Sequence, residues 1–477
     1  MPLSSLPNEI LTKIIRSISD LHDPIHGDHQ TLYYLCVCSR QLNIVTTPIL
    51  YSVWKEAHGN SLLQLLALVS TSPSLARSIE SLEVRDQRVS ADSSAHTSAF
   101  WFPVYVGNHD ETEPCLNGLA PDQLEDLCER MAIGECKERA QLLKAVQARH
   151  WDAVITLVVL CLPSLQRLKF NIRKIPESER FEPLDLVHIA GLYHWLEWGF
   201  QRAAKLQTSH PGGVDLPFGG DLEKLREVCW AFHEMFRRRE RQLLPQLLFL
   251  VSLPSLRSVS LTNIYRILEV VNPNGTEAPL LFPHIKRLSL INCRPRLWQL
   301  KFLPCFPCLE SFHIETNTQR GIPPLDIRLL RDCLKELMVI DYSYGSSYRR
   351  EGLSPRLMER HAYRDFCQLE SMDVTAQHLK GWVSDRWGDL DVYDGLSGVI
   401  PNSVKRLILR GCEKMVLEKV NVALNSGWPS ESRLEFLTLM CFQECRLRPW
   451  VLATMGGWEE ICNRAGVKLE IGWQPLA

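Results

Sequence analysis

One spacing of apolar residues recurs along this chain and limits what it can fold into. The pattern is apolar-x-x-apolar-x-apolar, and its clear copies are Leu165-Leu168-Phe170, Leu256-Val259-Leu261, Ile285-Leu288-Leu290, Leu309-Phe312-Ile314, Leu334-Leu337-Val339, Leu369-Met372-Val374, Val404-Leu407-Leu409 and Leu434-Leu437-Leu439, with Ile79-Leu82-Val84 as an earlier candidate. From Leu256 onward, successive starts lie 24 to 35 residues apart, close to the length of one strand and one helix. Stacked units of this kind bury one continuous core. The sequence therefore predicts an α/β solenoid of strand-helix units.

A proline stands just before several of these strands, at Pro163, Pro254, Pro283 and Pro307. Proline ends a preceding helix and favours an extended backbone in the residue before it. The same local device therefore sets each strand in the same register relative to its helix. A looser version precedes Val404, at Pro401.

These copies resemble the leucine-rich repeat in an irregular form. Cys293 and Cys412 stand three residues beyond the last apolar residue of their copies, where that repeat places a buried Asn or Cys. Asn263 comes one residue early, and the copies that start at 334, 369 and 434 lack the element. A helix-strand alternation that closes without repeats is the alternative.

Two intervals are too long for one repeat and predict insertions, between the starts at 79 and 165 and between those at 165 and 256. The first holds a loop over 90–119 and helical runs over about 121–132 and 137–160. The second holds helical runs over about 184–206 and 221–244, separated by a Pro-Gly-Gly break at 211–213 that forbids a continuous helix. We expect a helical insertion at about 175–250.

The beginning of the chain has a different, helical periodicity. Pro7 fits the first position of a helix, and Glu9 places a negative charge near its N-terminus, so a helix is expected from Leu6 or Pro7. Ile10, Ile14 and Ile18 recur at four-residue spacing on it. Further helices are expected over about 31–38 and 40–47, the last stopped by Pro48. Three short helices cover one another only in part, so an apolar face is left for docking.

This segment resembles an F-box over residues 3 to 54. The resemblance rests on Leu6-Pro7-Asn8-Glu9-Ile10-Leu11, then Val37-Cys38, then Pro48-Ile49-Leu50-Tyr51. It implies docking on the Skp-type adaptor of a cullin-RING ubiquitin ligase, and through that adaptor to the cullin and RING subunit. The implied adaptor contacts are Leu6, Pro7, Ile10, Ile14, Val37 and Cys38.

The chain departs from the F-box pattern in one respect. The connection from Ile18 to Val37 spans 19 residues, which is longer than the usual F-box connector. An ordinary three-helix cap on the following domain is the alternative. The expected domains are an F-box-like module over 1–54, a first strand with irregular loop and helical connector over 55–150, and a repeat domain over 151–477.

Composition excludes several function classes. The 53 basic and 55 acidic residues give a formal charge of −2, which implies no bulk attraction to nucleic acid. The basic run at 237–241 is expected on a helix, where neighbouring acids offset it. No stretch approaches the ~18 apolar residues of a membrane span. The 16 cysteines are scattered in apolar contexts and are expected to be thiols. These features fit a protein of the cytoplasm, the nucleus or both.

The search for enzyme chemistry and bound groups turns up no motif. The chain lacks a phosphate-binding Gly-Lys-Ser/Thr loop, a Gly-x-Gly-x-x-Gly turn, a His-Glu-x-x-His pair and a Gly-x-Ser-x-Gly elbow. Cys305 and Cys308 have a metal-like spacing but no second pair at finger spacing. We therefore expect no cofactor, no metal and no catalytic residue, although an enzyme site assembled within the insertions stays an alternative.

Together these features predict the substrate receptor of an SCF-type ubiquitin ligase. Outward positions on the strands would meet a target protein, and the residues we single out are Arg167, Lys169, Arg257, Lys286, Arg287, Glu310 and His313. Because the early strands carry basic residues, an acidic or phosphorylated target segment is a hypothesis. The main alternative is a repeat scaffold for protein interactions, with a degenerate F-box and no ligase.

Overall fold

A computed structural model describes sixteen stretches of the 477-residue chain: residues 6–21, 29–55, 61–86, 121–131, 136–147, 150–172, 194–209, 220–232, 251–263, 281–293, 303–316, 327–342, 363–376, 399–428, 432–442 and 447–474. The chain divides into two compact units. Unit 1 comprises Met1–Met235 with Gln246–Leu256, and unit 2 comprises Phe236–Pro245 with Arg257–Ala477. The loop predicted over 90–119, the Pro-Gly-Gly break at 211–213 and the basic run at 237–241 lie outside the described residues.

Unit 1 begins with three helices, α1 (Asn8–Leu21), α2 (His29–Cys38) and α3 (Arg40–Leu50). Pro7 precedes α1, and its carbonyl accepts hydrogen bonds from the N–H groups of Ile10 and Leu11, each at 3.0 Å. Ser39 ends α2 and caps α3, since its Oγ accepts from the N–H of Leu42 at 3.2 Å. The three helices expected from the sequence are confirmed, with α1 starting one or two residues later than predicted.

The prediction that Pro48 stops the third helix is wrong, because α3 continues to Leu50. Pro48 lies in the last turn of α3, so few residues follow it within the helix. The residue whose carbonyl loses its usual N–H donor is Ile44, four residues earlier, and Ile44 lies on the exposed side of the helix. The N–H of Tyr51 still donates to the carbonyl of Thr47 at 3.1 Å and closes the turn.

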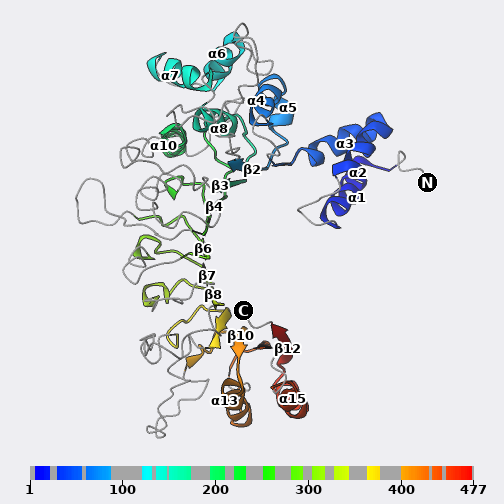
Figure 1. The fold of residues 1–477 in the computed structure, drawn as a ribbon, viewed down its shortest axis with the longest axis vertical. Helices are drawn as coiled ribbons and strands as arrows, with labels where there is room; N and C mark the ends of the chain where they lie inside the picture. Colours follow the sequence, from blue (N-terminus) through cyan, green and yellow to red (C-terminus); the bar gives the residue numbers. More distant parts are fainter. Residues whose placement is uncertain are drawn as a thin grey trace, which may run out of the picture. The chain divides into compact units, whose positions relative to one another are not determined.

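The rest of unit 1 alternates helices with parallel strands that pair in chain order (Figure 1). The strands are β1 (Val53–Lys55), β2 (Ser81–Asp86), β3 (Arg167–Ile172) and β4 (Glu227–Phe232). The helices are α4 (Ser61–Thr71), α5 (Pro73–Ala76), α6 (Pro121–Arg130), α7 (Cys136–Gln147), α8 (Trp151–Leu160) and α10 (His194–Ser209).

The described part of unit 2 contains eight parallel strands that also pair in chain order. They are β5 (Ser258–Thr262), β6 (Arg287–Ile291), β7 (Ser311–Thr316), β8 (Glu336–Asp341), β9 (Ser371–Thr375), β10 (Arg406–Cys412), β11 (Phe436–Phe442) and β12 (Lys468–Gln474). Its helices are the 3-10 turn η6 (Arg328–Leu330), α13 (Lys414–Asn425) and α15 (Leu447–Arg464). The twelve strands that the structure describes are parallel and alternate with helices, which makes the fold an α/β solenoid, as predicted.

The predicted apolar pattern is the buried side of these strands. In all nine copies singled out from the sequence, the three apolar residues have less than a tenth of their surface exposed. The middle and last residues of each copy lie on one strand and face inward, and register pairs them with the same positions of the next strand, as Leu288 pairs with Phe312 and Leu290 with Ile314. The inward side chains therefore stack into one continuous core within each unit.

Three strands were missed, and one expected helix is wrong. Residues 227–232, predicted as part of a helix over 221–244 and of a helical insertion, form β4. Leu225, Val228 and Trp230 repeat the apolar pattern and are buried. The short β1 and the terminal β12 were also missed. The helical run expected over 137–160 is two helices, α7 and α8, and the run over 184–206 appears as α10 from His194 to Ser209.

Buried cysteines close the turns after the strands of unit 2. The Sγ of Cys293 donates to the carbonyl of Leu261 at 3.3 Å, and the Sγ of Cys412 donates to that of Leu409 at 3.3 Å. Gly411, with φ of +67°, lies at the irregularity that brings Cys412 beside Cys441. Cys441 is fully buried and takes the register position of Cys412, although it lies only two residues beyond Leu439. Sequence counting missed it because the irregularity offsets the two strands by one residue.

No helix among the described residues is long and apolar enough to cross a bilayer. Burial raises the pKa of the thiols of Cys412, Cys441 and Cys462 above its ordinary value, which keeps them protonated at neutral pH. These cysteines therefore act as small apolar side chains.

Candidate functional site

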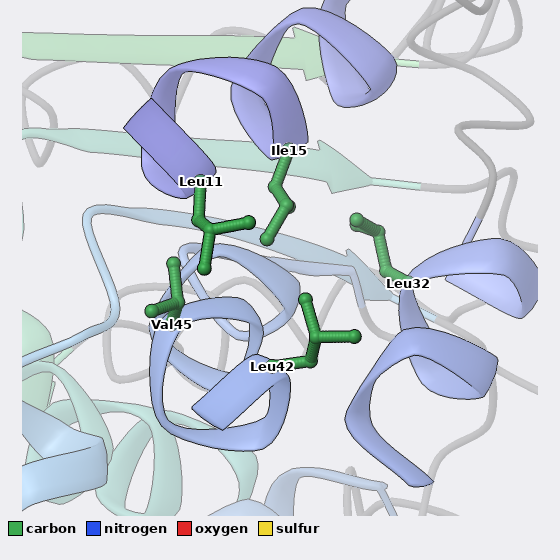
Figure 2. Packing of buried hydrophobic residues seen from close by; sticks show 5 residues of the cluster. All are labelled: Leu11, Ile15, Leu32, Leu42 and Val45. Carbon is green, nitrogen blue, oxygen red and sulfur yellow. The ribbon is translucent and has the colours of Figure 1, made fainter. Parts of the chain in front are cut away.

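The helices α1, α2 and α3, called here the N-terminal bundle, have a small core of their own. Figure 2 shows Leu11 and Ile15 of α1 pointing towards Leu32 of α2 and towards Leu42 and Val45 of α3. Each of these five side chains has less than a tenth of its surface exposed. The bundle therefore closes its core with one side of each helix, and the opposite sides are available to solvent or to a partner.

The chain leading into α1 is fixed to α3. The Nε2 of Gln41 donates to the carbonyl of Leu6 and to the Oδ1 of Asn8, both at 3.1 Å. Leu6 is half-buried and packs against the bundle core, whereas Pro7 is exposed. The Leu-Pro segment is therefore held in one place. Of its two predicted contact residues, only Pro7 has most of its surface open to a partner.

Apolar side chains remain exposed on α1 and α2. Ile10 is 42% exposed, Ile14 is 37% exposed and Val37 is 63% exposed, and Cys38 is exposed beside Val37. On α1, Ile10 and Ile14 are one helical turn apart and therefore share a face, next to the core residues Leu11 and Ile15. Isolated exposed apolar side chains are ordinary, whereas several on two helices of a small bundle make these helices a candidate docking surface.

Two exposed tyrosines on α2 were missed by the sequence reasoning. Tyr33 is 57% exposed and Tyr34 is 53% exposed, and their rings lie 6.1 Å apart. The signal was present in the spacing: the buried residues Leu32 and Cys36 are four apart, so helical geometry places Tyr33, Tyr34 and Val37 on the other side of α2. We define the docking face of the bundle as Pro7, Ile10, Ile14, Tyr33, Tyr34, Val37 and Cys38.

The second candidate site is the outward side of the strands. In unit 1, Arg167 of β3 forms an ion pair with Glu227 of β4 at 3.2 Å, and Lys169 of β3 lies 3.7 Å from Glu83 of β2. Asn171 also donates to Glu83, at 2.6 Å. Each predicted cation of unit 1 therefore already faces a carboxylate. This arrangement weakens the hypothesis of an acidic or phosphorylated target, because a target would have to displace that carboxylate.

In unit 2, the predicted residues Lys286 and Glu310 belong to a row of alternating positive and negative side chains at the strand starts, called here the charge ladder. The residue just before each strand reads Lys286, Glu310, Lys335, Glu370, Lys405 and Glu435 from β6 to β11, and backbone hydrogen bonds join each of these residues to the next. Glu310 lies 3.0 Å from Lys286 and 2.9 Å from Lys335, and Lys405 lies 3.4 Å from Glu370.

Two predicted basic residues beside the ladder point elsewhere. Arg257 lies before β5 and donates to the carbonyl of His284 at 3.5 Å, while Arg287 is exposed on β6. The hydrogen bonds from Lys335 and Lys286 lower the pKa of Glu310, which favours its charged form. Ion pairs at the strand starts therefore link β6, β7 and β8, and also β9 and β10.

Beyond the charge ladder, other polar side chains on the outward side of unit 2 also bind one another. His313 of β7 shares a hydrogen bond with the Oγ of Ser289 at 3.0 Å, and its Nε2 lies 3.3 Å from Glu315. Across β9 and β10, Arg410 donates from Nε and Nη2 to the two carboxylate oxygens of Asp373, at 2.6 and 2.8 Å. The side chain of Asp373 is only 5% exposed. This two-point ion pair fixes the relative position of two neighbouring strands.

The structure does not bring metal-ligating side chains together. Among the described residues, no group of three or more His, Cys, Asp or Glu side chains is placed to hold an ion. Cys305 is buried and Cys308 is half-buried, next to the start of β7. The described geometry thus offers two surfaces for macromolecular contact, the docking face of the bundle and the outward side of the strands.

Comparison with known proteins adds no relative, because no protein-family model and no curated protein sequence matches the chain.

Proposed function

We propose that this chain is the substrate-recognition subunit of an SCF-type cullin-RING ubiquitin ligase. The observation that carries the proposal is the docking face of the N-terminal bundle. Ile10, Ile14 and Val37 are exposed although the bundle has a complete core without them. These are residues through which the F-box-like motif would contact a Skp-type adaptor. Exposure on a folded bundle is what such contacts require, since burial inside the chain would prevent docking.

The proposed mechanism is positional. The bundle fastens the chain to the adaptor, and through it to the cullin and RING subunit, while the solenoid holds a target protein. The target's lysines are then held at a high effective concentration near the ubiquitin-conjugating enzyme, which accelerates transfer. This chain contributes no catalytic residue and no cofactor. The proposal places its work in the cytoplasm, the nucleus or both, where such ligases act.

We further propose that the solenoid is an irregular leucine-rich-repeat domain. Support comes from nine predicted pattern copies whose apolar residues are buried, from parallel strands in chain order, and from buried cysteines at the turns after β6 and β10. The outward side of the strands would meet the target. Its charges are largely paired between strands, so recognition there depends on shape and on individual polar groups more than on net charge.

A repeat scaffold without a ligase is the second candidate. The feature that favours it is the connection between Ile18 and Val37, which is longer than an F-box connector. In that case the docking face would hold some other partner or none, while the solenoid would still bind proteins. The two functions differ in one property, binding to the adaptor.

A pull-down of the intact chain with a Skp-type adaptor and cullin tests the proposal. The variant to compare is Ile10→Ala/Ile14→Ala/Val37→Ala, which removes exposed side chains and leaves the core residue Leu11 in place. Its matched control is Lys13→Ala/Arg16→Ala, which alters exposed charged residues of α1. We expect the intact chain and the control to retain both partners and the triple variant to lose them. Failure of the intact chain to bind the adaptor would leave the scaffold function.

A further inference from the structure

Strand β12 ends the described part of unit 2 with an incomplete core. It pairs with β11 and, among the described residues, with no second strand. Its inward side chains Leu469 and Ile471 are only half-buried, whereas Leu437 and Leu439, their register partners on β11, are fully buried. Among the described residues, the apolar face that β6 to β11 each share with two neighbours is therefore open at β12.

The outward side of β12 carries one charge of each sign. Lys468 and Glu470 are two residues apart, their side chains are 63% and 54% exposed, and their charged ends lie 2.8 Å from each other. Exposed strand edges attract further strands unless the edge is short, charged or covered. β12 is seven residues long, whereas β1 of unit 1 has only three. Because Lys468 and Glu470 charge this edge, only a strand that sets the opposite charge against each of them would pair with it.

We propose that β12 pairs with β12 of a second copy of this chain, antiparallel, about a two-fold axis at Leu469. In this register Lys468 of each copy lies opposite Glu470 of the other, on the outward side. Val467 lies opposite Ile471 on the inward side, and Leu469 lies opposite itself. Antiparallel pairing keeps opposite residues on the same face, so charge meets charge and apolar meets apolar between positions 467 and 471. Two-fold pairing also closes the assembly at two copies.

The self-complementary sequence is the reason to choose a second copy over a strand from another protein. Displacing the axis to Ile471 places Glu470 opposite Gly472 and Lys468 opposite Gln474, and both ion pairs are lost. Only the axis at Leu469 satisfies both charges and covers the half-buried Leu469 and Ile471. The inference is independent of ubiquitin-ligase function, because it uses no residue of the N-terminal bundle.

A single strand edge is a small interface, below the ~1,200 Å² of stable complexes, so the dimer dissociates on dilution. Sedimentation velocity on the full chain, from about 1 to 100 μM, covers that range. We expect the wild type to shift from one copy to two across the series. Lys468→Glu and Glu470→Lys each place like charges opposite one another, and we expect each to weaken dimerisation at least tenfold.

Charge exchange separates this pairing from damage to the fold. The double variant Lys468→Glu/Glu470→Lys restores opposite charges and should dimerise like the wild type. An equimolar mixture of the two single variants should form mixed dimers, since each Glu of one copy then meets a Lys of the other. Amide hydrogen exchange supplies a second readout: protection of residues 467–471 should rise with concentration in the wild type and not in the single variants. A wild type that stays monomeric, or single variants that dimerise as tightly as the wild type, would overturn the proposal.

Discussion

The N-terminal bundle and the strands of unit 2 use apolar residues in opposite ways. On β6 to β11, every inward position of the predicted pattern is buried, and several outward charges are paired between neighbouring strands. The bundle buries five side chains and leaves Ile10, Ile14, Tyr33, Tyr34 and Val37 exposed. The inward residues of the strands are thus covered within unit 2, whereas the bundle has exposed apolar side chains outside its own core. This difference separates residues that stabilise the fold from residues available for binding.

The largest expected effect comes from emptying the core of the strands. Phe312 on β7 is fully buried, so Phe312→Ala should destabilise unit 2 by about 3 to 5 kcal/mol through lost burial and a cavity. Phe436 on β11 is 42% exposed, so Phe436→Ala is the matched control and should change stability little. Urea denaturation measures both. Equal losses for the two variants would contradict the distinction between inward and outward positions.

The second largest loss of stability is expected when the ion pair between Asp373 and Arg410 is broken. Asp373→Asn leaves the partly buried guanidinium without its carboxylate, and we expect a loss of about 2 to 4 kcal/mol in the stability of unit 2. Lys405→Gln removes an exposed member of the charge ladder and should cost less than about 1 kcal/mol. When the denaturation is repeated at high salt, only the loss of stability caused by Lys405→Gln should become smaller. If Asp373→Asn costs no more stability than Lys405→Gln, the ion pair at Asp373 does not fix the two strands as described.

A buried carboxyl predicts a pH dependence in unit 1. The Oδ1 and Oδ2 of Asp152 accept from the N–H groups of Ala153 and Trp195, at 3.0 and 3.1 Å, and so join the starts of α8 and α10. Burial nevertheless raises the pKa of Asp152 to about 6 from 3.8. A raised folded-state pKa gives stability that is fully present below the unfolded pKa and lost as pH rises through the folded pKa.

Asp152→Asn isolates that contribution. Between pH 4 and pH 6 the wild type should lose about 2 kcal/mol relative to the variant, whose amide does not titrate. Urea denaturation at half-unit steps of pH gives the difference between the two curves, in which the other titrating groups cancel. Parallel curves across this window would show that Asp152 titrates near its ordinary pKa.

The smallest effect on stability is expected on the docking face. Ile10→Ala and Val37→Ala remove side chains that are already largely exposed, so each should lower the stability of the bundle by less than about 1 kcal/mol. Leu11→Ala, one residue along α1, removes a buried side chain and should cost about 2 to 4 kcal/mol. Thermal denaturation followed by circular dichroism compares them. A large loss for Ile10→Ala would show that Ile10 belongs to the core.

The sequence predicted the parts of the fold that depend on local spacing. Three apolar residues at fixed spacing identified nine strands, because that pattern lies within six residues of chain. β4 was assigned to a helix although Leu225, Val228 and Trp230 repeat the apolar pattern, and β12 was missed because Gly466 and Gly472 flank a short apolar alternation. The pairing of Arg167 with Glu227, 60 residues apart, depends on the register between strands and could not be read from either segment alone.

The candidate site, like the fold, was predicted from the sequence only in part. The exposure of Ile10, Ile14 and Val37 agrees with their assignment as contact residues, and adaptor binding itself stays a prediction. Leu6 packs against the bundle core, which the Leu-Pro motif alone could not show. Tyr33 and Tyr34 were overlooked although the four-residue spacing of Leu32 and Cys36 placed them outside the core.

The most direct test of the account is the affinity of the purified full chain for a purified Skp-type adaptor, measured by isothermal titration calorimetry. The account predicts saturable one-to-one binding by the wild type and by Lys13→Ala/Arg16→Ala, and at least a hundredfold weaker binding by Ile10→Ala/Ile14→Ala/Val37→Ala with unchanged circular dichroism. No heat of binding from the folded wild type, or equal affinity for the triple variant, would contradict it.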